Sequence, residues 1–209
     1  MSELFSIQLQ NRQQQGGDGV WLDLPTTTER VQAAPRQIGI SSDNPQGLFI
    51  SGYFAEEEKR FAIPYNMVLA SNVDELNFLA SRLETLSTGE RAELNAALQA
   101  PQSELFSIGR ITDFPENVDY YVHLPDVRGP AQLGDYYLNR SGMVDMPEEW
   151  KGGIDTAQFG RYVAQQEQGA FTQYGYLVKS GDAWQKVHEG QPVPEEYRVL
   201  SFPVPEVMR

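Results

Sequence analysis

The chain has 209 residues, of which 40% are hydrophobic, and it contains no cysteine. It is long enough to bury a sizeable core as one large domain or as two or three small ones, while disulfides, thiol catalysis and thiolate metal sites are excluded. Its 29 acidic and 16 basic residues give a net charge of −13, which excludes unaided binding to the nucleic-acid backbone or to anionic membranes.

The sequence carries no recognisable membrane or export signal. Apolar runs are shorter than the roughly 18 residues that a transmembrane helix needs. The N-terminal residues lack the charged and apolar regions of a secretory signal. Together with the absence of cysteine, these features lead us to expect a cytoplasmic protein.

One hexapeptide, SELFSI, occurs twice, at residues 2–7 and 103–108. Each copy precedes aromatic and β-branched residues that end in Leu-Pro, at 19–25 and 119–125, a pattern typical of a strand stopped by proline. A polar helical stretch and a Gly-Tyr-containing strand follow each one. We therefore predict two related strand–strand–helix–strand units about one hundred residues apart. The alternative is a chance match.

Between these units, apolar residues three or four apart over residues 73–86 predict an amphipathic helix. Asn72 and Glu75 have the spacing of a capping box at its start, and Ser87 and Glu90 repeat that spacing for a second helix. The segment is therefore a predicted helical hairpin.

In the second half, Gly129-Pro130 predicts the start of a helix, and residues 146–150 predict a short one. Asp155 is expected to cap a further helix. The tail, residues 180–209, contains four prolines and strand-like runs, so we expect an appended strand or two and a loose end.

These elements predict an α+β fold. Two small antiparallel-sheet-plus-helix units, at residues 1–65 and 103–209, are expected to flank a helical middle domain at residues 66–102.

Catalytic chemistry finds little support in the residues. The two histidines, His123 and His188, accompany no Gly-x-Ser-x-Gly elbow. Glycine-rich phosphate loops and metal-ligand spacings are also missing, so we expect neither a metal nor another cofactor. We interpret the protein as a non-enzyme, with a hydrolase that uses two of its carboxylates as an alternative.

The acidic residues are unevenly distributed. Residues 74–126 hold ten acidic and three basic residues, whereas residues 168–209 hold five and four. Such an excess is typical of the solvated faces of amphipathic helices. A surface displayed to a basic partner is the alternative, but the spacing of the acids alone favours ordinary solvated faces.

Several of these segments, in this order, resemble the ArdA family of antirestriction proteins. Residues 19–25 look like the family's first domain, residues 71–77 like the start of its helical middle domain, and the similarity runs over about residues 4–178. The most specific part resembles the family's third domain and antirestriction-motif region, and consists of LGDYYL at 133–138, SG at 141–142, MPE at 146–148, FGRYV at 159–163 and GAFTQYGY at 169–176.

The resemblance implies an elongated, acidic homodimer that mimics bent B-form DNA and occupies the DNA groove of a type I restriction-modification enzyme, at its methyltransferase core. The unpaired acids would then stand in for phosphates. The candidate carboxylates are Glu75, Glu84, Glu90, Glu93, Asp113, Glu116, Asp119, Asp126, Asp135, Asp145, Glu148, Glu149 and Asp155. The candidate antirestriction-motif and dimer residues are Leu133, Gly134, Tyr136, Tyr137 and Gly142, and we expect the two tyrosines to pack in a core or a dimer seam.

A second interpretation is an acidic interaction module of a mobile genetic element that binds another basic partner, such as a nucleoid or partition protein. Two features depart from the family. The net charge of −13 is modest for a DNA mimic. Residues 180–209 extend beyond the family's usual end.

Overall fold

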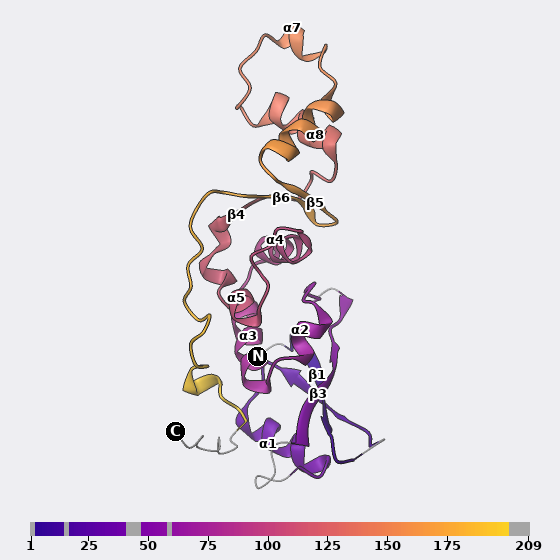
Figure 1. Cartoon of the computed structure of the whole chain (residues 1–209), viewed down its shortest axis with the longest axis vertical. Helices are drawn as coiled ribbons and strands as arrows, with labels where there is room; N and C mark the ends of the chain where they lie inside the picture. The colour runs from indigo at the N-terminus through magenta and orange to yellow at the C-terminus, as the bar shows by residue number, and fades with distance from the viewer. Residues whose placement is uncertain (1–2, 15–16, 41–46, 58–59, 201–209) are drawn as a thin grey trace. The chain divides into compact units, whose positions relative to one another are not determined.

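The computed structural model describes residues 3–14, 17–40, 47–57 and 60–200 (Figure 1). Contacts between residues divide the chain into two compact units. Unit 1 contains Met1–Leu86, Phe106–Pro115 and Lys186–Arg209, and unit 2 contains Ser87–Leu105 and Glu116–Gln185. Each unit combines a three-stranded antiparallel sheet with helices, so the predicted α+β class is confirmed. The three domain boundaries drawn from the sequence stay a prediction.

The sheet of unit 1 has the order β2-β1-β3, with β1 (Phe5–Asn11) between β2 (Val20–Leu24) and β3 (Leu48–Phe54). Side chains alternate between the two faces of a strand, and Phe5, Ile7 and Leu9 of β1 are all buried. The antiparallel register between β1 and β3 shifts between Gln8 and Leu9, as at a β-bulge. The core of unit 1 therefore lies on one face of this sheet.

Four helices accompany this sheet: α1 (Thr28–Gln37), α2 (Tyr65–Leu69), α3 (Val73–Glu84) and α5 (Ile108–Thr112). A glycine follows α1: Gly39 has φ of +71°, the left-handed backbone conformation in which many helices end. The predicted capping box of α3 is present: the Asn72 side chain accepts a hydrogen bond from the Glu75 N–H, and the Glu75 carboxylate accepts one from the Asn72 N–H. α3 packs against both β2 and α5 (Figure 1).

Residues 186–200, called the strap below, cross unit 1 without joining its sheet. The Asp113 carboxylate accepts hydrogen bonds from the backbone N–H groups of His188 and Glu189, at 2.6 and 3.2 Å. The Asp74 carboxylate accepts two more, from Val199 and Leu200. Side-chain oxygens thus accept the backbone hydrogen bonds of the strap that a neighbouring strand would accept in a sheet.

Aromatic packing also holds the strap. The Phe78 ring lies between the rings of His188 and Tyr197, at centroid distances of 4.9 and 4.7 Å. The strap contains only a 3-10 turn, η6 (Glu195–Tyr197). The strands expected within residues 184–187 and 197–202 are therefore absent from the described part of the chain, and that prediction was wrong there; residues 201–202 lie outside it.

The sheet of unit 2 has the order β4-β6-β5, with β6 (Gly175–Lys179) between β4 (Tyr121–Leu124) and β5 (Ala170–Thr172). Helix α4 (Thr88–Gln99) packs on β4 and β6, and its predicted Ser87/Glu90 capping box is present. Two 3-10 turns, η3 (Phe114–Glu116) and η4 (Val118–Tyr120), precede β4.

Between β4 and the β5–β6 hairpin, the chain forms α6 (Pro130–Asp135), its π-helical continuation η5 (Tyr136–Arg140), α7 (Glu148–Lys151) and α8 (Thr156–Gln166) (Figure 1). Gly129 and Pro130 begin α6 as predicted, and Asp155 caps α8 by accepting hydrogen bonds from two backbone N–H groups. The expected short helix over residues 146–150 corresponds to α7.

The predicted internal repeat was wrong. The first SELFSI copy enters β1, whereas in the second copy Ser107 caps the short helix α5 through its side-chain oxygen. The central strand of one sheet is the first strand of its unit, and that of the other sheet is the last strand of its unit. A hexapeptide takes its conformation from its surroundings, and in the second copy Glu104 contacts β4 and β6 through side chains: its N–H donates to the Tyr121 hydroxyl, and its carboxylate pairs with Lys179.

Helices α6 and α8 cross at two glycines. A Cβ atom at Gly134 would lie 1.9 Å from the Thr156 carbonyl oxygen, and one at Gly160 would lie 1.8 Å from the Pro130 carbonyl oxygen. Both contacts are to backbone, so no side-chain movement relieves them. These glycines fix the helix separation in unit 2.

Replacing Gly160 with alanine should therefore force α6 and α8 apart and destabilise unit 2 by on the order of 3 kcal/mol. The control is Gly89→Ala at the exposed start of α4, where a Cβ meets nothing within 4 Å. Removing this helical glycine should stabilise the protein by roughly 0.5–1 kcal/mol. Urea denaturation followed by the amide NMR signals of unit 2 measures both changes. Equal midpoints for the two variants would contradict the close crossing.

Replacing Asp113 with alanine should release the strap. Two partly buried N–H groups then lose their acceptor, at a cost on the order of 2 kcal/mol in the free energy of unfolding. Hydrogen exchange at the amides of His188 and Glu189 should become faster in this variant, while the amides in the sheet of unit 1 stay protected. Asp18→Ala, at an exposed acid, is the control and should leave these amides protected.

Candidate functional site

The thirteen candidate carboxylates occupy three kinds of environment. Asp113 is fully buried beneath the strap, with 0% of its surface exposed. Six are half-buried: Glu75, Glu84, Glu90, Glu93, Glu116 and Asp135. Six are exposed: Asp119, Asp126, Asp145, Glu148, Glu149 and Asp155. Asp113 is therefore corrected from a surface candidate to a structural acceptor, because the strap covers it and uses both of its oxygens.

Several half-buried or exposed acids have local structural partners. Glu75 and Glu90 complete the capping boxes of α3 and α4, and Asp155 caps α8. Hydrogen bonds from Ser87 lower the pKa of the Glu90 carboxyl, so this group is ionised at neutral pH. These acids stabilise helix starts whatever else they do.

Two of the candidates in unit 2 pair with nearby bases. Asp135 lies 3.6 Å from the Arg140 guanidinium, and Glu148 lies 2.6 Å from the Lys151 ammonium. Among the candidates, four exposed acids accept no side-chain hydrogen bond and form no ion pair with the residues that the structure describes: Asp119, Asp126, Asp145 and Glu149. These four, all in unit 2, are called the open carboxylates below.

Acids gather where α4 meets the turn η4. Glu90 and Glu93 lie three residues apart on α4, and Asp119 belongs to η4. Burial, and then the negative charges of Glu90 and Asp119, raise the pKa of Glu93 to about 8. Glu93 therefore holds a proton at neutral pH, while its two neighbours display the charge.

The five motif residues are mainly structural. Leu133 is buried in a core cluster with Val127 and Tyr176, and Tyr136 and Tyr137 pack against that cluster, as expected for the two tyrosines. Gly134 permits the crossing with α8 described above, and Gly142 ends the η5 turn with φ of +70°. Their part in a dimer seam stays a prediction.

One carboxylate in this region escaped the sequence analysis. Glu167, after α8, accepts hydrogen bonds from the hydroxyls of Tyr137 and Tyr176, at 2.7 and 2.5 Å. Burial and this contact raise the pKa of both tyrosines, which stay protonated. No motif distinguishes a single acid after a helix, so only the three-dimensional contact reveals it.

The histidines occupy structural positions. The Nε2 atom of His123 lies 2.9 Å from the Tyr174 carbonyl oxygen, and His188 packs edge-on against Phe78. Across the described ranges, no group of three or more acids and histidines is arranged to hold a metal ion. None of the helices seen in these ranges is long and apolar enough to cross a membrane.

This arrangement defines an acidic α+β binding protein whose candidate site is a displayed set of carboxylates. The family model described as antirestriction protein (ArdA) matches residues 17–178, and the chain belongs to this family. Its function is antirestriction, directed at restriction-modification enzymes. A search of curated proteins finds no match. The strap lies beyond the matched residues.

The Glu93 environment predicts a measurable titration. Its carboxyl signal, followed by ¹³C NMR, should shift with a pKa of about 8. The unfolded chain titrates this group near its ordinary value, so the folded state holds the extra proton over the interval between the two values. Stability should therefore fall as pH rises through that interval and level off above about pH 8.

Substitutions can measure how much each neighbouring acid raises the pKa of Glu93. Glu90→Gln should lower the pKa of Glu93 more than Asp119→Asn does, because Glu90 contributes the larger repulsion. Asp126→Asn is the control, since Asp126 is not among the groups that shift Glu93. Titration of Glu93 near its ordinary value in the unsubstituted protein would show that these carboxylates are not crowded.

Proposed function

We propose that this antirestriction protein acts as a homodimer that mimics B-form DNA and competitively occupies the DNA-binding cleft of a type I restriction-modification enzyme. The observation that carries the proposal is the set of open carboxylates. These acids are exposed in unit 2 and are not neutralised by described residues of the chain. They join Glu90 and the other charged acids of that unit.

The physical basis is substitution of one anion for another. A cleft that binds DNA holds arginine and lysine side chains at positions set by the phosphates. Carboxylates that already lie at the surface without partners can accept those side chains without first breaking internal ion pairs. The mechanism is equilibrium competition, and no covalent bond is made or broken.

Exposed apolar side chains support self-association through unit 2. Met143, Trp150 and Tyr162 are 75%, 66% and 60% exposed. Exposed apolar side chains that gather into one patch mark protein–protein contacts, and the proposed dimer would bury these three in such a patch. A dimer would double the number of displayed carboxylates, and the gain in affinity follows from both halves binding one target.

The direct test is displacement of a labelled duplex from a type I methyltransferase. The protein should displace the duplex at low salt, and moderate salt should weaken the competition, because screening reduces the attraction between carboxylates and basic groups. Light scattering on the inhibitor alone should give the mass of two chains. Failure to displace DNA at either salt concentration would refute the proposal.

Charge placement can be separated from total charge with two quadruple variants. Asp119→Asn, Asp126→Asn, Asp145→Asn and Glu149→Gln together remove the open carboxylates, and should weaken competition by about 10- to 100-fold, at a few tenths of a kcal/mol or more for each. The control removes four exposed acids of unit 1: Asp18→Asn, Glu57→Gln, Glu195→Gln and Glu196→Gln. An equal loss in both variants would show that only net charge matters.

A further inference from the structure

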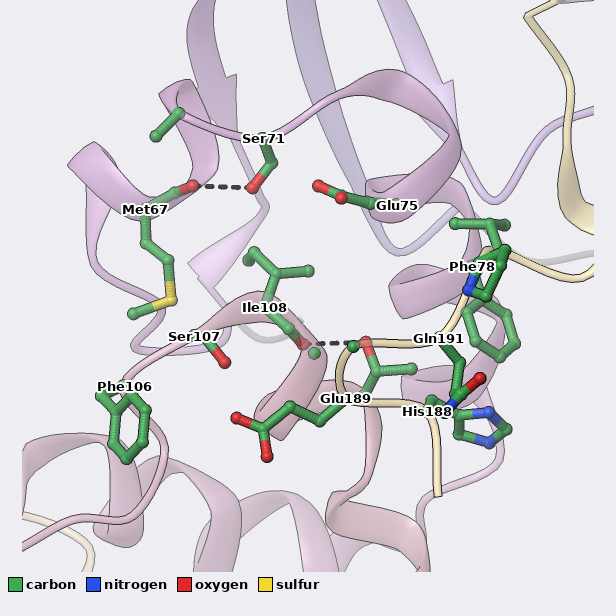
Figure 2. Close-up of a pocket in the computed structure, with 16 residues that line it drawn as sticks. Met67, Ser71, Glu75, Phe78, Phe106, Ser107, Ile108, His188, Glu189 and Gln191 are labelled. Atoms are coloured by element: carbon green, nitrogen blue, oxygen red, sulfur yellow. Dashed lines mark hydrogen bonds between the residues drawn. The ribbon is translucent and has the colours of Figure 1, made fainter. Parts of the chain in front are cut away.

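Unit 1 contains a half-open cavity of about 630 Å³ that the carboxylate surface does not use. Its wall combines α2, α3, α5 and the strap, and Met67, Phe106, Ile108 and Pro192 supply apolar surface. Figure 2 shows Glu75 reaching into it from α3, and Glu189 and Ser107 also line it. This volume lies within the range of small-ligand sites, which is about 300–1,000 Å³.

The charge of the cavity is negative. Glu189 is compensated, because its carboxylate binds Arg110 at 3.1 Å and Lys186 at 3.3 Å. Glu75 accepts only a 3.4 Å hydrogen bond from the Asn72 N–H and forms no ion pair with any described residue. Glu75 therefore supplies a carboxylate that no base of the described chain neutralises.

The wall also offers an aromatic face. Phe106 is 63% exposed, although it borders a cavity. The Arg110 guanidinium lies 4.5 Å from its ring centroid, so this ring already stacks with one guanidinium. Arg110 itself is buried and bound to Glu189, and offers no free positive charge to a ligand.

These features select among occupants. An anion would meet Glu75 with no free base to receive it. A neutral apolar group would remove water from Glu75 without replacing its hydrogen bonds, which is costly. A cation with an apolar stem satisfies the carboxylate with its charged group and the apolar wall with its stem, and a guanidinium can form two parallel hydrogen bonds with a carboxylate, which an ammonium cannot.

We propose that this cavity receives an arginine side chain of the protein partner, with the guanidinium on Glu75 and the aliphatic stem along the apolar wall to which Phe106 belongs. For the identity of the partner, the inference rests on the proposed function, because a cleft that binds DNA displays arginines. The strap, which lies beyond residues 17–178 matched by the family model, supplies one wall. The cavity thus depends on a part of the chain outside that match.

A pentapeptide, acetyl-Gly-Gly-Arg-Gly-Gly-amide, tests the cavity without the enzyme. Titration should shift the amide NMR signals of Met67, Phe106 and Gly109, which line the cavity. The same peptide with citrulline, a neutral isostere of arginine, should bind about tenfold more weakly. Equal binding of the two peptides would overturn the inference.

Matched variants locate the contact. Glu75→Gln removes the charge but keeps a residue that completes a capping box, and should weaken arginine-peptide binding about tenfold. Glu29→Gln alters another first-turn acid of unit 1, in α1, and should leave binding unchanged. Binding that is insensitive to Glu75→Gln would place the peptide elsewhere.

The enzyme assay then separates this inference from the proposed function. Phe106→Ala changes no charge, and should raise the inhibitor concentration needed to displace DNA several-fold. Displacement by the unsubstituted protein with no effect of Phe106→Ala would overturn the cavity contact and leave DNA mimicry standing. If the unsubstituted protein displaces no DNA, the proposed function fails, and the peptide titration alone decides whether the cavity binds arginine.

Discussion

Repulsion between carboxylates is the constraint on which this structure depends, because the chain has 29 acidic and only 16 basic residues. It must fold around small cores although many of its acidic side chains have no base to pair with. The chain meets this constraint by using acids as hydrogen-bond acceptors for its own backbone. Glu75, Glu90 and Asp155 satisfy N–H groups at helix starts, and Asp74 and Asp113 satisfy N–H groups of the strap. In each case a negative charge stabilises local structure instead of opposing it.

This use of acids changes the meaning of net charge for function. Asp113 is buried, Glu93 carries a proton at neutral pH, and Asp135 and Glu148 each have a base within 4 Å. The burial of Asp113 and the proton on Glu93 make the charge available to a partner smaller than the formal −13, whereas the two ion pairs, whose bases are already counted in that net charge, only reduce the number of places where it is displayed. The two contacts that we propose use different residues: the first uses the open carboxylates of unit 2, and the second uses Glu75 in the cavity of unit 1.

Short sequence patterns predicted the helix starts and helix caps, which depend only on neighbouring residues. Capping boxes, the proline that begins α6 and the Asp155 cap each depend on neighbours within four residues, and all are present. The strap could not be predicted in this way, because Asp74 binds residues more than 120 positions away. The second SELFSI copy shows the same limit, since a hexapeptide does not encode which strands will lie beside it. Glu167 likewise acquires its role only when Tyr137 and Tyr176 converge on it.

The pKa of Glu93 also bears on how closely negative charges can be spaced on a protein that mimics DNA. B-form DNA carries one charge per roughly 1.7 Å of helix axis, whereas acids three or four residues apart on a helix have Cβ atoms about 5–6 Å apart. Even at this wider spacing, partial burial and then two neighbouring acids raise the pKa of Glu93 to about 8, so Glu93 adds no charge at neutral pH to the carboxylates that we propose as phosphate substitutes. Contact with water favours the charged form of a carboxyl group, and the open carboxylates are all exposed. A protein decoy must therefore present fewer charges than the duplex over the same length, and additional contacts of another kind, such as an arginine bound in a cavity, can compensate for that deficit.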